Sequence, residues 1–352
     1  MTSGGVQATT KLKALYALHP RFRTDSQSAA NFYRKFLEDF QKGRTVPIRG
    51  SFTHDGEFLT INIRHCTVAQ KRRHFGKSLL VAAGDPILEF SAAFEFPGSD
   101  SFFLTDQSGT KISRSIDQSI GDWKSTLAHQ LELTIQSYFC ALAIAYTGVV
   151  RPIQNVWIQD GSAHGTDRCH LSEVHDSIEF LRERNAFPEI DLELDKVITW
   201  TFSQNGIFDG YSDTPASRAL NYFTRLFVSD FRNDELSDLI WALAGIEALL
   251  VENGRSSVGQ LKEKLSALFA ETISFQWLSK MITDSYNFRS RMIHGDRQMR
   301  SFFRSGEEES KKRFDEEYHS ELFAIGMLVL LLRFVISKEL TEIRFKTVLK
   351  SA

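Results

Sequence analysis

The segment Tyr286-Asn-Phe-Arg289-Ser-Arg291-Met-Ile-His294-Gly-Asp296 decides the fold of the C-terminal part of the chain. From Ser274 onward apolar residues recur at helical spacing, and the stripe that contains Leu278 also contains Arg289. Ser274 is a typical N-cap residue, and Gly295 is the usual residue at the left-handed position that follows a helix. The pattern therefore predicts one helix that begins after Ser274 and ends near His294.

Arg289 and His294 are the candidate catalytic residues of this helix. A charge on an apolar stripe faces the interior or a partner subunit, where it is costly without a counter-charge. His294 follows five residues later, about 140° further round an ideal helix, so the two side chains converge only if Arg289 reaches along its stem or the last turn is distorted. Histidine exchanges protons near neutral pH, which suits acid-base catalysis. The alternative is a histidine that caps the helix and an arginine that pairs with a buried acid.

A second predicted helix opens near Asn233 and supplies such an acid. Glu247 lies on its apolar stripe, four residues after Leu243 and three before Leu250. An acid and a base on two buried stripes predict an ion pair between Glu247 and Arg289. Either Glu247 orients a catalytic arginine, or the pair fixes the register of the two helices. A further helix lies in sequence between the helix of Glu247 and the helix of Arg289. Ser257, with Gln260 three residues later, predicts a capping box at its start.

Three segments in this order, 239–250, 261–265 and 286–295, resemble the HEPN superfamily, and within it the ApeA-like group. The typical pattern of that group is an "IEALL" helix, a short helix and an "RSxxxHG" helix, and the resemblance covers about residues 213–337. It implies an all-helical domain that dimerises and, in many members, a metal-independent ribonuclease with an Arg-x4-6-His core. By this match Arg289 and His294 are the catalytic pair, with Ser290 and Arg291 in supporting positions. It further implies that two subunits bring their motifs into one cleft.

The rest of the sequence predicts an α+β protein with a boundary between residues 205 and 206. Residues 1–205 form a mixed region with a small antiparallel sheet and helices, and residues 206–352 form an all-α, HEPN-like bundle that begins with Thr214 as N-cap and Pro215 as first helical residue. The first ten residues are expected to be disordered. Helices are predicted at 29–41, 121–146 and 173–184, and strands at 51–65, 78–83, 87–96, 101–105, 156–158 and 197–202.

Composition limits the partners of the chain. The 42 Lys and Arg residues against 44 Asp and Glu give a net charge of −2, so any RNA contact must come from local basic patches. The candidates are Lys71, Arg72 and Arg73 in the N-terminal region and Arg297, Arg300 and Arg304 beyond the motif, although such segments are more often solvated loops. Three cysteines without a repeating spacing and the lack of a signal-like N-terminus predict a reduced, cytoplasmic protein.

No metal, cofactor or membrane is expected. His164, Cys169, His170 and His175 lie within twelve residues, but their spacing matches no common zinc site. The apolar run 322–332 is shorter than the ~20 residues that cross a bilayer. The resemblance implies a metal-independent endoribonuclease, a homodimer that acts on RNA in phage defence or a toxin-like system, whose N-terminal region selects or senses the substrate. The alternative is a non-catalytic dimerisation or interaction module that binds a regulatory protein or a nucleotide.

Overall fold

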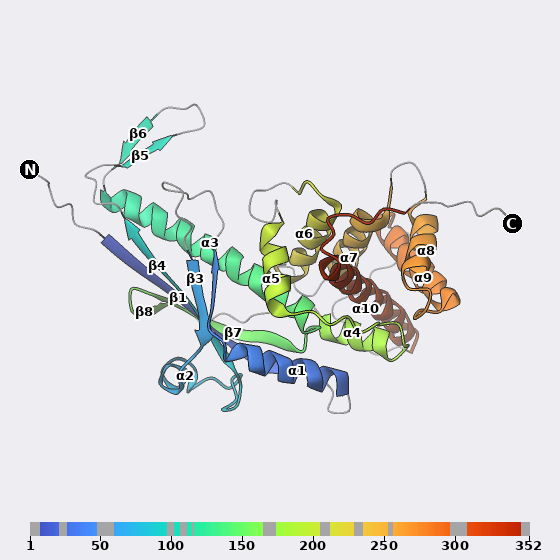
Figure 1. The fold of residues 1–352 in the computed structure, drawn as a ribbon, viewed down its shortest axis with the longest axis horizontal. Coiled ribbons are helices and arrows are strands. Elements are labelled where there is room, and N and C mark those ends of the chain that lie inside the picture. Colours follow the sequence, from blue (N-terminus) through green and yellow to red (C-terminus); the bar gives the residue numbers. More distant parts are fainter. Residues whose placement is uncertain are drawn as a thin grey trace, which may run out of the picture. The chain divides into compact units, whose positions relative to one another are not determined.

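The computed structural model describes residues 8–20, 27–47, 60–96, 102–105, 111–114, 116–164, 174–204, 212–228, 235–252, 256–295 and 308–345. In these residues the protein is α+β, with a six-stranded antiparallel sheet, a two-stranded sheet and ten helices (Figure 1). The predicted fold class is thus confirmed. The chain forms two compact units. Unit 1 comprises 1–20, 34–136 and 152–169, and unit 2 comprises 21–33, 137–151 and 170–352. The division at 205/206 stays a prediction.

Unit 1 contains both sheets. The large sheet has the order β2-β3-β4-β1-β7-β8, and the two-stranded sheet pairs β5 with β6. In the centre, Leu15 lies opposite Glu89 and Glu89 lies opposite Arg64. The strands are β1 (Ala8–Pro20), β2 (Arg44–Pro47), β3 (Thr60–His65), β4 (Ile87–Phe96), β5 (Phe102–Thr105), β6 (Lys111–Arg114), β7 (Val150–Gln159) and β8 (Ser162–His164).

The central strands of the large sheet are buried on both faces. Side chains alternate between the faces of a strand, so neighbours in sequence serve different cores. On one face Leu15, Ile87 and Val156 pack with Phe75 of helix α2 (Val68–Phe75). On the other face the rings of Tyr16 and Phe90 meet edge to face at 5.5 Å. This two-sided burial explains why β1 and β4 read as nearly continuous apolar runs.

Unit 2 is helical and is built around α10. The helices are α4 (Val174–Arg182), α5 (Leu194–Ser203), α6 (Pro215–Val228), α7 (Glu235–Leu250), α8 (Ser257–Leu268), α9 (Phe275–Ile293) and α10 (Glu308–Ser337), while α1 (Gln27–Phe40) and α3 (Ile116–Ala145) have residues in both units. Helix α10 contacts α4, α5, α6, α7 and α9. At Gly326 it approaches α4 so closely that a Cβ atom would lie 2.8 Å from the Ser177 carbonyl oxygen.

The apolar part of α10 is a core helix. Its segment Asp315–Ser337 is 23 residues long and apolar enough to cross a membrane by length and composition. However, 89% of its apolar window is buried inside the protein. This burial is consistent with a soluble protein.

Arg333 is the one arginine of α10 that is fully buried among the described residues. Its Nη1 donates to the carbonyl oxygens of Ile144 and Ala145, at 3.1 Å for the latter, and its Nη2 donates to the carbonyl oxygen of Ile190. Ala145 ends α3, so the guanidinium also meets the negative end of that helix dipole. Burial lowers the pKa of Arg333 to about 10, which leaves it charged at neutral pH.

Most elements lie where the sequence predicts them. The helices at 29–41, 121–146 and 173–184 are found as α1, α3 and α4, and Thr214 caps α6 by accepting the backbone N–H of Ser217 at 3.1 Å. The strands at 87–96, 101–105 and 156–158 are found as β4, β5 and β7, and the described part of 51–65 is β3. The N-terminal region does contain an antiparallel sheet.

Five local predictions are wrong. Residues 197–202 belong to helix α5, because their apolar residues bury a helical face that includes Leu194. Residues 78–83 form bends without strand pairing. Residues 8–10 begin β1 and are not disordered. The run from Lys71 is helical rather than a loop. Ser257 forms no capping box, because Gln260 instead bonds the backbone of Glu252.

Candidate active site

The predicted ion pair between α7 and α9 is present. Nη1 of Arg289 lies 3.2 Å from Oε1 and 3.3 Å from Oε2 of Glu247. The Arg289 side chain is 26% exposed and the Glu247 side chain is 23% exposed, so solvent screens the ion pair only in part. Glu247 therefore fixes the direction of the Arg289 guanidinium.

Tyr286 is a third member of this cluster, and the sequence analysis assigned it no role. It precedes Arg289 by three residues, hence by about one helical turn, and its ring centroid lies 5.8 Å from the guanidinium carbon. Burial, followed by the negative charge of Glu247, raises the pKa of the Tyr286 hydroxyl. The hydroxyl therefore stays protonated at physiological pH. An aromatic residue three positions before an arginine on a predicted helix is the sequence signal that could have predicted this contact.

His294 ends α9 in an exposed position. Its backbone has φ −87° and ψ 0°, and its N–H donates to the Ser290 carbonyl oxygen at 3.0 Å. Gly295 follows with φ +71°, the left-handed conformation that its position predicts. Ser290 and Arg291 are exposed on the same last turn. The imidazole is thus open to a ligand or to a second subunit.

The structure does not bring the two catalytic candidates together within one chain. Arg289 is directed to Glu247 on α7, whereas His294 is exposed at the helix end, about 140° away around the axis. A site that uses both groups on one phosphate needs either a movement of this turn or a second chain. Arg297, Arg300 and Arg304 lie outside the described residues.

The N-terminal basic residues lie on α2 and have different surroundings. The Lys71 ammonium donates to the carbonyl oxygens of Ala83 at 2.6 Å and Asp85 at 2.8 Å, so it holds the following loop. Arg72 and Arg73 are exposed. The helix starts with a capping box between Thr67 and Gln70, a motif that is visible in the sequence and was not used to predict it.

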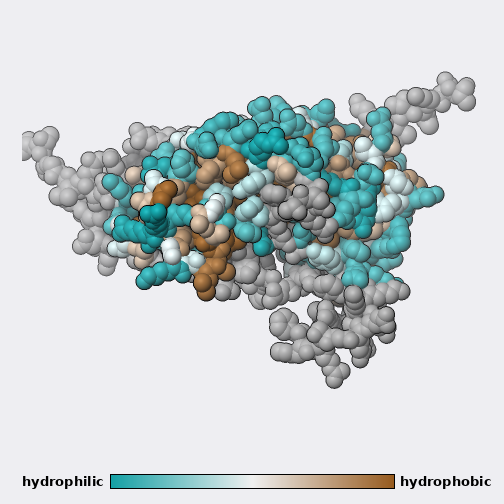
Figure 2. Space-filling model, turned by 90° about the horizontal axis from the view of Figure 1, so that it is seen from below, coloured by the Kyte–Doolittle hydropathy of each residue, from teal (hydrophilic) through white to brown (hydrophobic). Residues whose placement is uncertain are grey.

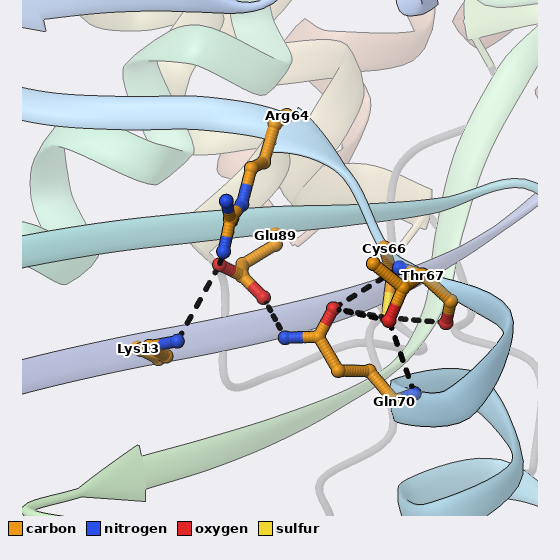
Figure 3. Close-up of polar contacts among 6 residues, drawn as sticks. All are labelled: Lys13, Arg64, Cys66, Thr67, Gln70 and Glu89. Carbon is orange, nitrogen blue, oxygen red and sulfur yellow. Dashed lines mark hydrogen bonds and ion pairs between the residues drawn. The ribbon is translucent and has the colours of Figure 1, made fainter.

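A second polar cluster surrounds Glu89, which is fully buried in β4 (Figure 3). Arg64 donates to Oε1 through Nε at 2.9 Å and Nη2 at 2.6 Å, and the Lys13 ammonium lies 3.6 Å from the same oxygen. The Gln70 amide donates to Oε2. Three donors therefore satisfy the carboxylate, and Gln70 links it to the cap of α2. We assign this cluster a structural role in fastening α2 to the sheet.

Cys66 adjoins this cluster and is expected to be a poor nucleophile. Burial and the charge of Glu89 raise the pKa of its thiol to about 11. Because the thiolate is the reactive form, alkylation of Cys66 in the native protein should be slow at neutral pH and rise about tenfold per pH unit toward that value. Mass spectrometry after timed iodoacetamide treatment measures this, with denatured protein as control. Rapid alkylation of native Cys66 at neutral pH would contradict the environment described.

No metal site is apparent in the part of the chain that the structure describes, where no three His, Cys, Asp or Glu side chains gather as metal ligands could. His164 ends β8 and His175 is buried in α4. Cys169 and His170 lie outside the described residues.

Comparison with known proteins gives no relative for this chain: no protein-family model, curated protein or solved structure matches it. The resemblance to HEPN proteins accordingly stays an expectation from the motif residues.

Proposed function

We propose that the chain is a metal-independent endoribonuclease of the HEPN type that acts as a cytoplasmic homodimer. The proposal rests on one observation, the orientation of Arg289 together with the exposure of His294. Arg289 is oriented by Glu247, and His294 is exposed at the C-cap of the same helix. One group supplies a fixed positive charge and the other an accessible acid or base.

In the proposed reaction His294 removes the proton of a ribose 2′-hydroxyl, and the 2′-oxygen attacks the adjacent phosphorus. The bond from phosphorus to the 5′-oxygen breaks, and that oxygen leaves with a proton from His294 of the partner subunit, which the proposed dimer brings to the same site. Arg289 stabilises the negative charge that grows on the phosphoryl oxygens. The products are a 2′,3′-cyclic phosphate and a 5′-hydroxyl.

Two exposed apolar residues on α9 support a homodimer. Phe275 is 59% exposed and Ile293 is 58% exposed. They lie at opposite ends of α9, and the face between them is buried, with Ile282 1% exposed. Ile293 is also the neighbour of His294. A second copy that covers Ile293 would bring its own motif close to His294, as the resemblance implies.

The experiment that tests the activity is incubation of a mixed RNA pool with the purified protein in a metal chelator, followed by analysis of the fragment ends. Cleavage that leaves 2′,3′-cyclic phosphates is expected. Fragments with 3′-hydroxyl ends that form only when Mg²⁺ is added would contradict the proposal.

Replacing Glu247 by glutamine tests whether this residue positions Arg289. The amide keeps the size and one acceptor oxygen but removes the charge, so we expect the cleavage rate at saturating RNA to fall roughly tenfold, with a smaller change in KM. Glu247 contacts Arg289 and takes no part in the proposed bond changes, so its effect on the rate must pass through Arg289. A pair that only fixes helix register predicts instead a lower Tm with an unchanged rate for the folded protein.

The second candidate is a non-catalytic interaction module. The same contact favours it, because a Glu247–Arg289 pair with the Tyr286 ring against the guanidinium also stabilises the packing of α7 on α9. In that case the exposed surface at Ile293 and His294 would bind a protein or nucleotide partner. Failure of every RNA to be cleaved, together with capture of a defined partner on this surface, would favour the module.

For the ribonuclease, the remaining roles are proposed from the sequence. Unit 1 would select or sense the substrate, a regulatory protein would control the activity, and Arg297, Arg300 and Arg304 would hold RNA next to His294. The role in phage defence or a toxin-like system is proposed from the resemblance alone.

A further inference from the structure

One segment of unit 1 carries only positive charges. Residues 66–83 contain four Lys or Arg residues and no Asp or Glu, although the whole chain carries a net charge of −2. The segment consists of α2 and the loop that follows it. It is therefore a local source of positive potential on a slightly acidic protein.

Three of its four basic side chains are available to a partner. Arg72, Arg73 and Lys77 are exposed, whereas Lys71 is used to hold the loop. Burial and neighbouring Arg73 lower the pKa of His74, so this residue adds no positive charge at neutral pH. The surface thus carries three fixed cations.

The same segment exposes three large aliphatic side chains. The relative exposures are 66% for Val68, 102% for Leu79 and 46% for Leu80, and these are three of the five large hydrophobic residues exposed in the described chain. On the side of the molecule where α2 lies, Figure 2 shows hydrophobic surface next to strongly hydrophilic surface. Apolar side chains gathered at a surface point to a binding site.

The loop is built to present these leucines. The Ser78 N–H donates to the Phe75 carbonyl oxygen at 2.9 Å, and the Ser78 hydroxyl donates to Oε1 of Gln154 on β7 at 2.6 Å. The Leu80 N–H donates in turn to the Ser78 hydroxyl at 3.2 Å. Ser78 therefore fastens the loop to the sheet, and Leu79 projects outward from a fixed backbone.

We propose that the surface formed by Val68, Arg72, Arg73, Lys77, Leu79 and Leu80 binds an anionic lipid membrane. A bilayer interface accepts protruding aliphatic side chains without a preformed groove, and its anionic headgroups attract the three cations that flank them. RNA offers phosphates but no apolar layer, and stacking of its bases needs exposed aromatic side chains, whereas Phe75 is buried. This proposal departs from the expectation of no membrane partner, which was drawn from the length of the apolar run 322–332.

Sedimentation of the full chain with lipid vesicles tests this inference. We expect retention on phosphatidylcholine vesicles that contain phosphatidylserine, loss of retention in high salt, and little retention on phosphatidylcholine alone. The double variant Leu79→Ser/Leu80→Ser and the triple variant Arg72→Gln/Arg73→Gln/Lys77→Gln should each bind about tenfold more weakly or worse. Their Tm should be unchanged, because all five side chains are exposed.

Arg218→Gln is the matched control, since it removes an exposed cation from α6, and it should leave vesicle binding unchanged. The inference is overturned if the wild type does not bind phosphatidylserine vesicles, or if the two-leucine variant binds them as well as the wild type. It is also overturned if the triple variant loses retention on immobilised RNA while no form of the protein binds vesicles, because the surface is then a nucleic-acid site. None of these outcomes depends on ribonuclease activity.

Discussion

Replacing Arg333 by alanine is expected to destabilise unit 2 by about 3–5 kcal/mol. The side chain is fully buried and its guanidinium serves the carbonyl oxygens of Ile144, Ala145 and Ile190. Without it, these three acceptors remain in a dry interior and a cavity opens beside Phe32, over whose ring the guanidinium lies at 5.4 Å. Urea unfolding followed by circular dichroism should show the midpoint of unit 2 shifted to lower urea.

Two further variants identify the cause. Arg333→Met restores much of the lost volume but none of the donors, so it should remain nearly as unstable as the alanine variant. Arg218→Ala removes an exposed arginine on α6 of the same unit and should change stability by less than about 0.5 kcal/mol. A fully stable Arg333→Met protein would show that filling space, not bonding the carbonyl oxygens, is what Arg333 provides.

Replacing Arg289 by alanine should lower the rate of RNA cleavage by about 10²–10³-fold, the usual effect of removing a group that stabilises a transition-state oxyanion. Because Arg289 also pairs with Glu247, this variant should lose some stability as well. Single-turnover cleavage at a temperature well below the Tm separates the two effects. The rate must fall although the protein is folded.

Arg289→Lys provides the matched comparison. Lysine keeps the positive charge and can still reach Glu247, so most of the stability should return. It lacks the planar fork of the guanidinium, and we expect the cleavage rate to recover only in part. Full activity in Arg289→Ala would remove Arg289 from the catalytic residues.

The helical parts of the fold could be predicted because their signals are local. The stripe through Leu278 and Arg289 and the glycine at 295 define α9 without knowledge of any other element. Strand predictions were less secure where burial on two sides removes the alternation of polar and apolar residues. Residues 197–202 show the limit: β-branched and aromatic residues favour a strand, yet they lie in α5, where Trp200 Nε1 donates to the Leu340 carbonyl oxygen at 3.4 Å.

The candidate site was predictable in its charged pair but not in its surroundings. Two costly charges on two apolar stripes suffice to pair Glu247 with Arg289. In contrast, Glu89 lies 76 residues from Lys13 and 25 from Arg64 in the sequence. The register that brings these residues together depends on three strands, so no single segment of sequence predicts it. The fixed outward direction of Leu79 likewise depends on Gln154 of a distant strand.

The most direct test of the central claim compares wild type and His294→Ala in the cleavage of a mixed RNA pool in chelator, with melting curves for both. His294 is exposed at a helix end, so its removal should leave the Tm unchanged. The proposed role as base or acid predicts that cleavage falls by about 10²–10⁴-fold. Equal cleavage by the two proteins, or an inactive wild type with a destabilised variant, would contradict the account.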